Sequence, residues 1–138
     1  MKVGDLAKRP PVTLHVDATV GEVAAVMAAH NIGAVVIVDT EGRPLGIVTE
    51  KDLVRAMARG VPNTAKALEV GTSKDLLTAK PEDGVYQVLV AMRKRGVRHV
   101  ILVDNTGKAV GVLSVRDFLE DPVLKELGES ARWPKTQE

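Results

Sequence analysis

Short apolar runs alternate with polar stretches along the chain, and the runs follow two different periods. Val23, Val26 and Met27 recur at the spacing of one face of a helix. In contrast, Ala34–Val38 and His99–Val103 are nearly all apolar and rich in β-branched side chains. Runs of this second kind are typical of strands that are covered on both faces. The pattern therefore predicts an α/β chain in which helices alternate with short buried strands.

Capping residues mark the start of one predicted helix and the ends of two. Thr19 and Glu22 have the spacing of a capping box, in which the threonine oxygen accepts from a backbone N–H and the glutamate reaches back. Asn31 and Gly96 follow two helical segments, and these residue types best tolerate a left-handed C-cap. We therefore expect one helix to end at Asn31 and another at Gly96.

Each buried run is followed by a turn and a second apolar run. Asp begins and Gly ends the turns at 39–42 and 104–107, where glycine supplies the residue with positive φ. The runs Leu45–Val48 and Val110–Leu113 then follow. We expect each to return as the antiparallel partner of the buried run before it.

The chain is a tandem duplication with a period of 65 residues and no gap. Each copy begins with an extended segment, at Val12–Leu14 and Leu76–Thr78, and Thr49 and Ser114 begin a second helix in each. The unit is β-α-β-β-α, with its first two strands parallel through a right-handed crossover. Identical residues at this period include the pairs Thr13 and Thr78, Val20 and Val85, Val35 and Val100, Asp39 and Asp104, and Asp52 and Asp117.

Two such units can bury each other's open surface. A three-stranded sheet with helices on one face leaves the other face bare, so we expect the copies to pack sheet to sheet with pseudo-twofold symmetry. The repeats are predicted at 1–60 and 67–121, with a linker at 61–66 and a C-terminal helix and tail at 122–138. Asp121 is the expected cap of that helix, Pro122 its first residue and Gly128 its stop, and Trp133 lies in the tail.

Composition narrows the class of protein. The 138 residues carry 19 Lys+Arg and 18 Asp+Glu, and this balance argues against a general binder of polyanions. The absence of cysteine excludes disulfides and thiolate metal sites. Only Tyr86, Phe118 and Trp133 are aromatic, too few for a platform that stacks nucleic-acid bases. No apolar leader opens the chain and no run approaches the ~20 residues that span a bilayer, so we expect a cytoplasmic protein without membrane or nucleic-acid partners.

Thr49-x-x-Asp52 and Ser114-x-x-Asp117 are the motifs best suited to ligand chemistry. One interpretation is structural, because Thr and Ser are good N-caps and an acidic residue three positions on favours the positive end of a helix. The other is a binding site: the helix N-terminus takes a phosphate, and an ionised aspartate accepts from two ribose hydroxyls. Both copies also keep a glycine three residues before the hydroxyl, where a missing side chain lets a ligand approach the backbone. We therefore favour the binding site.

These motifs resemble those of a known family. Gly46–Asp52 and Gly111–Asp117 are similar to the glycine–hydrophobic–x–Thr/Ser–x–x–Asp signature of CBS domains, the modules named after cystathionine β-synthase. Ile32–Asp39 and Val97–Asp104 resemble the family's second strand, and Val3–Leu6 resembles its lead-in segment. The resemblance covers about residues 2–120, with both copies in order.

The resemblance implies a CBS pair, or Bateman module, with two clefts between the copies. In relatives such clefts bind AMP, ADP or ATP, and in some cases S-adenosylmethionine or NAD, and the modules are regulatory rather than catalytic. No obligatory cofactor is implied. Main-chain groups near Val12 and Ile32, or their counterparts, would read adenine. By this resemblance one cleft combines Thr49 and Asp52 with Thr78, Val97, Arg98 and His99. The other combines Ser114 and Asp117 with Val12, Thr13, Ile32, Gly33 and Ala34.

The two clefts differ in charge. Arg98 and His99 stand in one copy where Gly33 and Ala34 stand in the other. Because a planar guanidinium pairs with phosphate through two hydrogen bonds, we expect the Asp52 cleft to hold phosphates more tightly. The alternative for Arg98 is a solvated basic helix end together with Arg93–Arg95, where cations complement the helix dipole.

Other residues with reactive side chains give weaker signals. His15, His30 and His99 lack the spacing of a metal site. The basic run Arg93–Arg95 is short and has no interleaved aromatics, which favours a solvated helix face. Ser114 has no adjacent base and no Gly-x-Ser-x-Gly turn. We therefore predict neither a metal site nor a catalytic residue.

The sequence thus predicts an adenosine-nucleotide-binding regulatory module rather than an enzyme. We expect it to sense energy status or a metabolite, to form a homodimer, and to act in trans on a separate enzyme or transporter. A structural dimerisation and interaction module with vestigial clefts is the alternative, and nucleic-acid binding is a third hypothesis, for which a steep salt dependence would be the sign.

Overall fold

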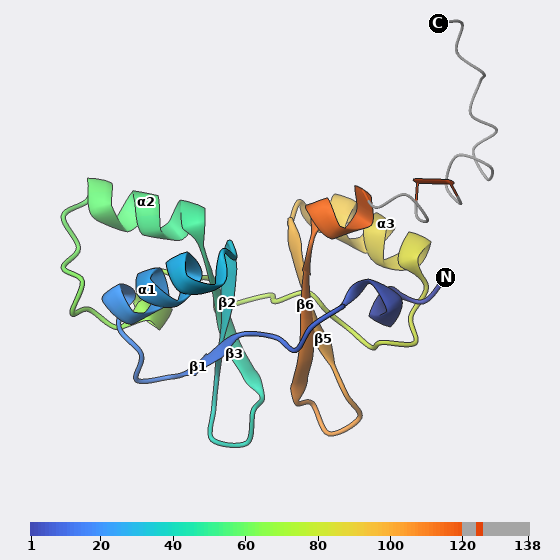
Figure 1. Ribbon diagram of the computed structural model, residues 1–138, viewed down its shortest axis with the longest axis horizontal. Coiled ribbons are helices and arrows are strands. Elements are labelled where there is room, and N and C mark those ends of the chain that lie inside the picture. Colours follow the sequence, from blue (N-terminus) through green and yellow to red (C-terminus); the bar gives the residue numbers. More distant parts are fainter. Residues whose placement is uncertain (120–123, 126–138) are drawn as a thin grey trace, which may run out of the picture.

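The computed structural model describes residues 1–119 and 124–125, which form two three-stranded sheets with helices on their outer sides (Figure 1). The first half contains β1 (Thr13–His15), α1 (Val20–His30), β2 (Ala34–Val38), β3 (Pro44–Thr49) and α2 (Glu50–Ala58). The second half contains β4 (Thr78–Ala79), α3 (Val85–Arg95), β5 (His99–Val103), β6 (Ala109–Ser114) and the 3-10 helix η3 (Val115–Leu119). Two further 3-10 helices, η1 (Val3–Leu6) and η2 (Ala67–Glu69), precede the halves.

Both sheets have the topology predicted from the repeat. The strand orders are β1-β2-β3 and β4-β5-β6, with the first pair parallel and the second pair antiparallel in each. The register shifts between Ile37 and Val38 in one hairpin and between Leu102 and Val103 in the other. Because these positions are 65 residues apart, the duplication extends to the irregularity of the ladder. The mixed α/β fold is confirmed.

The predicted caps and turns are present. Thr19 Oγ1 accepts from the Glu22 N–H at 3.2 Å, and Glu22 Oε1 accepts from the Thr19 N–H at 2.9 Å. Asn31 has a φ of 53° and Gly96 a φ of 64°, so each helix ends in the left-handed conformation. The turn glycines at 42 and 107 have φ values of 84° and 86°.

The second helices of the two halves differ. Thr49 caps the nine-residue helix α2, whereas Ser114 precedes a five-residue 3-10 helix. Phe118 holds this shorter element to the core, since it is buried among residues of the second half. The expected helix start, stop and tail aromatic at 121, 122, 128 and 133 lie outside the described residues. None of the described helices combines the length and apolar character needed to cross a membrane.

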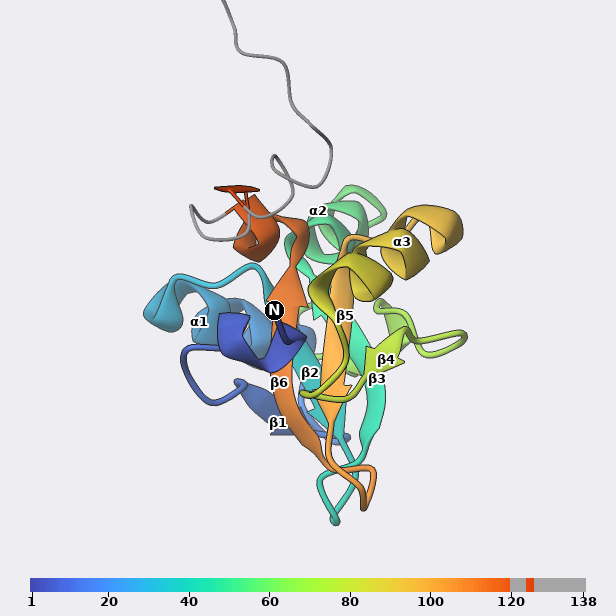
Figure 2. The ribbon, with the colours of Figure 1, turned by 90° about the vertical axis from the view of Figure 1, so that its right-hand side faces the viewer.

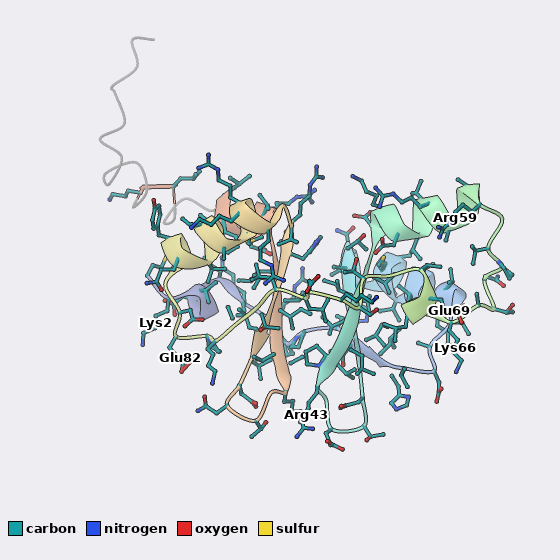
Figure 3. All side chains as sticks on the ribbon, turned by 180° about the vertical axis from the view of Figure 1, so that it is seen from behind. Lys2, Arg43, Arg59, Lys66, Glu69 and Glu82 are labelled. Carbon is teal, nitrogen blue, oxygen red and sulfur yellow. The ribbon has the colours of Figure 1, made fainter. Side chains whose placement is uncertain are left out.

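The bare faces of the two sheets cover each other, as predicted (Figure 2). Val36 and Ile47 of the first sheet share one buried apolar cluster with Ile101 and Ala109 of the second. At the hairpin tips, the Ala109 N–H donates to the Gly42 carbonyl at 2.9 Å. Arg43 (Figure 3) extends this contact, with Nε 3.5 Å from the Thr106 carbonyl oxygen.

The lead-in segments are exchanged between the halves. Val3 and Leu6 of η1 are buried in the core of the second half, with Val85 and Phe118 among their neighbours. Conversely, Ala67 of η2 is buried in the core of the first half. Backbone hydrogen bonds fix both segments, from the Val3 N–H to the Asp83 carbonyl at 2.7 Å and from the Ala67 N–H to the Ala18 carbonyl at 2.9 Å. Each half is therefore completed by a segment that precedes the other one.

Candidate functional site

A cavity of about 1450 Å³ lies between the two halves. It is lined by segments of both copies, so neither half forms it alone. The structure brings together every predicted site residue except Thr78. The lining includes Val12, Thr13, Ile32, Gly33, Ala34, Thr49, Asp52, Val97, Arg98, His99, Ser114 and Asp117.

Thr78 lies in a different hollow. It lines a small pocket of about 220 Å³ together with Asp83, Gln87 and Ala91. The neighbouring Leu76 lines the large cavity, and Leu77 lines both hollows. Because Thr78 is the first residue of β4 and lines its pocket together with residues of α3, it does not join the set around Asp52.

Asp52 and Thr49 form a closed capping box at the start of α2. Thr49 Oγ1 accepts from the Asp52 N–H at 3.3 Å. In return, Asp52 Oδ2 accepts from the Thr49 N–H at 2.9 Å and from the Thr49 hydroxyl at 3.0 Å. Within the described part of the chain, no hydrogen bond reaches the other carboxylate oxygen, Oδ1. The fold therefore uses one carboxylate oxygen of Asp52, and the other has no hydrogen-bond partner among the described residues.

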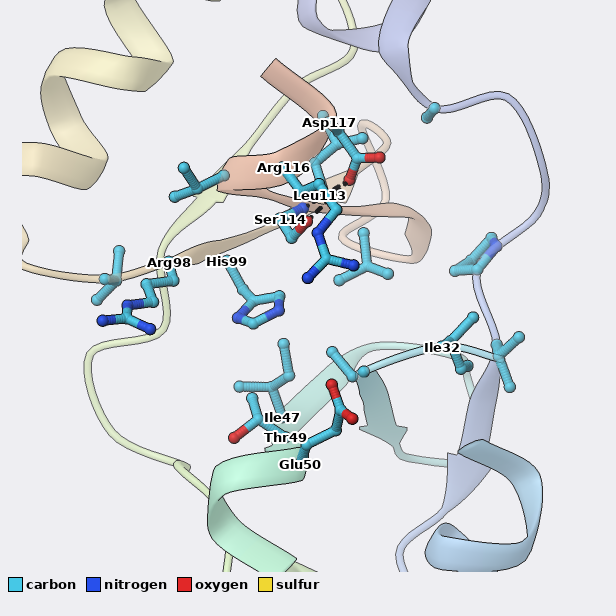
Figure 4. Close-up of a pocket in the computed structure, with 18 of the residues that line it drawn as sticks. Ile32, Ile47, Thr49, Glu50, Arg98, His99, Leu113, Ser114, Arg116 and Asp117 are labelled. Carbon is cyan, nitrogen blue, oxygen red and sulfur yellow. Dashed lines mark hydrogen bonds between the residues drawn. The ribbon is translucent and has the colours of Figure 1, made fainter. Parts of the chain in front are cut away.

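Asp117 and Ser114 repeat this arrangement at the start of η3 (Figure 4). Asp117 Oδ2 accepts from the Ser114 N–H at 2.8 Å and from the Ser114 hydroxyl at 3.4 Å. Both aspartates thus have the structural role that was the alternative to ligand binding. They nevertheless both line the open cavity rather than facing a plug of apolar side chains. The capping role and a ligand role are compatible here.

The glycines that open the two motifs do not serve the ligand, and that expectation was wrong. A Cβ at Gly46 would lie 2.8 Å from the Thr72 carbonyl oxygen and against the Leu68 side chain. A Cβ at Gly111 would lie 3.2 Å from Leu102 and 3.3 Å from Ala7. Both glycines lie within strands, at the point where neighbouring protein segments pass closely.

His99 lies between the two aspartate motifs rather than in one cleft (Figure 4). Burial lowers its pKa below the ordinary value. The carboxylates of Asp117 and Asp52, and to a smaller extent Glu50, raise the pKa. The Arg98 guanidinium lowers it further. Because the net shift is downward, the imidazole is neutral at pH 7. The sequence assigned His99 to the Asp52 cleft alone, since only the packing of the two sheets brings it near both carboxylates.

Arg98 and Ile32 lie at opposite ends of the cavity, with His99 between them (Figure 4). Arg98 is exposed, and the described residues offer its guanidinium no hydrogen bond or ion pair. By contrast, Arg95 at the end of α3 donates to the Asp75 carbonyl. Arg98 therefore lines the cavity with an exposed guanidinium, whereas Arg95 is tied to the Asp75 segment.

Several charged residues of the cavity were missed by the sequence prediction, Glu50 and Arg116 among them. Glu50 follows Thr49, Arg116 precedes Asp117, and both line the cavity. Their positions inside the two motifs were a usable signal, because a residue adjacent in sequence to a motif residue lies close to the same part of the cavity. The guanidinium of Arg116 and the carboxylate of Glu50 both extend toward the middle of the cavity (Figure 4).

The histidines are dispersed over the molecule. His15 lies 3.5 Å from Asp17 through Nδ1, and His30 lines the cavity at the end of α1. Among the described residues there is no group of three His, Cys, Asp or Glu side chains that could hold a metal ion.

Comparison with known proteins identifies the repeat. The CBS domain family model matches the chain twice, at residues 3–59 and 67–123. A CBS domain protein from Pyrobaculum aerophilum, solved in complex with AMP, is 35% identical with a TM-score of 0.85, over 94% of this chain and 99% of that one. The CBS domain pair of protein MJ0100, solved with 5-methylthioadenosine and S-adenosyl-L-methionine, is 30% identical with a TM-score of 0.77, over 86% and 96% of the two chains.

Relatives known by sequence include longer proteins. An uncharacterized protein from Methanopyrus kandleri is 33% identical over 127 residues, which are 90% of this chain and 64% of that protein. An L-aspartate semialdehyde sulfurtransferase from Methanocaldococcus jannaschii is 30% identical over 84% of this chain and 22% of its own length. The chain thus spans less than two thirds of both relatives. Its two matched halves, its exchanged lead-ins and its paired Thr/Ser-x-x-Asp motifs show that it belongs to the CBS domain family, as a tandem pair.

Proposed function

We propose that this chain is a regulatory module that binds adenosine nucleotides in the cavity between its halves. The observation that carries the proposal is that both Thr/Ser-x-x-Asp motifs face one open cavity built from the two copies. A purely structural pair of caps has no need of such a space. The solved relatives support an adenosine ligand, since their structures hold AMP, 5-methylthioadenosine and S-adenosyl-L-methionine.

Each part of the nucleotide has a matching group. Main-chain groups near Val12 and Ile32, or their counterparts in the other copy, read the adenine. The free oxygen of each aspartate accepts from the ribose hydroxyls, because an ionised carboxylate is an acceptor only. In the Asp52 cleft, the N-terminus of α2 and the guanidinium of Arg98 then take the phosphate. This cleft holds AMP, ADP or ATP more tightly than the other.

In this proposal the nucleotide regulates by changing how the module assembles with a second copy or with a partner protein. Val54 and Met57 on α2 are 68% and 82% exposed, and Tyr86 on α3 is 68% exposed. These apolar side chains provide a surface for a homodimer or for a separate enzyme or transporter that the module controls. A nucleotide that binds two arrangements of this assembly unequally shifts their populations, so the module senses energy status or a metabolite. The same surface is what the alternative, a structural interaction module with vestigial clefts, would use.

Thermal unfolding with a panel of AMP, ADP, ATP, S-adenosylmethionine and NAD tests the proposal. A ligand that binds the folded state at a hundredfold excess over its Kd adds about 2.7 kcal/mol to the free energy of unfolding. We expect at least one adenosine ligand to raise the midpoint, and guanosine monophosphate to serve as the unresponsive control. If no member of the panel moves the midpoint, the structural alternative is correct.

A further inference from the structure

The repeat places unlike groups at equivalent positions of the two clefts. Arg98 precedes β5, and Gly33 takes its place before β2. Val115 follows Ser114, and Glu50 takes its place after Thr49. Matching backbone bonds confirm both equivalences: the Glu50 N–H donates to the Gly33 carbonyl at 3.1 Å, and the Val115 N–H to the Arg98 carbonyl at 2.9 Å.

Glu50 occupies the space that a side chain at position 33 would need. A Cβ built on Gly33 would lie 2.5 Å from Oε1 of Glu50. The carboxylate of Glu50 therefore lies where the side chain of Arg98 begins in the other copy. Among the described residues it has no hydrogen bond or ion pair, and it lies between Thr49 and Ile32 (Figure 4). The two clefts thus carry opposite charges at the same structural position.

The cavity also holds cations at matching positions of the two copies and in the segment before Val12. Arg116 faces the same space as Glu50, but its equivalent in the first copy, Lys51, also lines the cavity, so this cation is common to both halves. Lys8 and Arg9 line the cavity from the segment before Val12. In the proposed binding mode that segment meets the adenine, whereas Glu50 lies beside Gly33 and the hydroxyl motif.

We propose that the Asp117 cleft selects adenosine ligands with a cationic 5′ group, such as a sulfonium, over those with a 5′-phosphate, and that Glu50 is the specificity-determining residue. This inference rests on the proposed function, because it assumes that adenosine occupies both clefts. With the base near Ile32 and the ribose on Asp117, the 5′ end points toward the carboxylate of Glu50. A phosphate carries up to two negative charges there, so it is repelled, while a sulfonium is attracted.

Binding calorimetry of the Asp52→Ala variant tests the inference, since that variant lacks the ribose acceptor of the other cleft. Asp52→Asn, which keeps a capping oxygen, replaces it if Asp52→Ala does not fold. In this background we expect S-adenosylmethionine to bind most tightly, methylthioadenosine next and AMP most weakly. Adding Glu50→Gln should strengthen AMP about tenfold and weaken S-adenosylmethionine, as expected for one unit charge several ångströms away in a partly solvated site.

Two further variants make the test specific. Val115→Glu, made in the Asp117→Ala background, places a carboxylate at the equivalent position of the Asp52 cleft and should weaken AMP about tenfold. Glu41→Gln, which removes an exposed glutamate paired with Arg43 at 3.0 Å, should leave both affinities unchanged. An unchanged ratio of AMP to S-adenosylmethionine affinities in Glu50→Gln would overturn the inference alone. Failure of every adenosine ligand to bind the wild-type chain would instead overturn the proposed function, and the inference with it.

Discussion

At the scale of single residues, His99 is a titratable group of the cavity whose pKa the fold shifts. Burial lowers its pKa even though Asp117 and Asp52 face it from the two halves, and Arg98 and Glu50 act in opposite directions. With the imidazole uncharged, Arg116 is the labelled cation near the middle of the cavity, and Arg98 lies at one end (Figure 4). The packing of two sheets, rather than any local motif, sets this state.

The pKa shift of His99 predicts how stability depends on pH. Because the folded pKa lies below the unfolded value of 6.5, the unfolded chain binds more protons near that pH. The free energy of unfolding should therefore be highest above pH 6.5 and should fall as the pH drops through the folded pKa. Urea unfolding from pH 8 to pH 5 measures this. His99→Gln should lose this part of the slope, whereas His15→Gln should keep it; an equal slope in wild type and His99→Gln would contradict the prediction.

At the scale of elements, α1 and α2 begin with the same type of threonine cap, but only the cap of α2 lines the cavity. Thr19 caps α1 and Thr49 caps α2 through the same reciprocal bonds. Thr19→Ala and Thr49→Ala should each lower the free energy of unfolding by about 1 kcal/mol, the usual effect of losing a cap. Only Thr49→Ala should also weaken AMP binding, because Thr49 lines the cavity. Chemical unfolding and calorimetry on both variants check this. Equal losses of AMP affinity would show that the cap acts only through stability.

Local signals were sufficient to predict most elements. Residues that must adopt positive φ, such as Asn31 and Gly107, stand at the expected ends and turns, and the buried runs of β2 and β5 have the predicted bounds. The failures involve contacts that are distant in sequence. The role of Gly46 depends on where Leu68 passes, and the position of Thr78 depends on α3. A single sequence does not show which residues distant along the chain come into contact.

At the scale of the whole molecule, the exchanged lead-ins tie the two halves into one cooperative unit. Each core contains apolar side chains from the segment that precedes the other half, with Val3 and Leu6 in one and Ala67 in the other. The sequence indicated a lead-in segment but not which half would bind it.

Leu6 provides the test of this coupling, because it belongs to the first repeat in sequence and to the second core in space. Leu6→Ala should lower the free energy of unfolding by about 2–5 kcal/mol, the usual cost of emptying a buried leucine site. Glu69→Ala, at an exposed side chain of η2, should change it by less than about 0.5 kcal/mol. Native-state hydrogen exchange should show equal loss of protection in β2 and β5, since both cores unfold together. Loss confined to β5, whose Val100 and Leu102 share a core with Leu6, would mean that the two halves unfold independently.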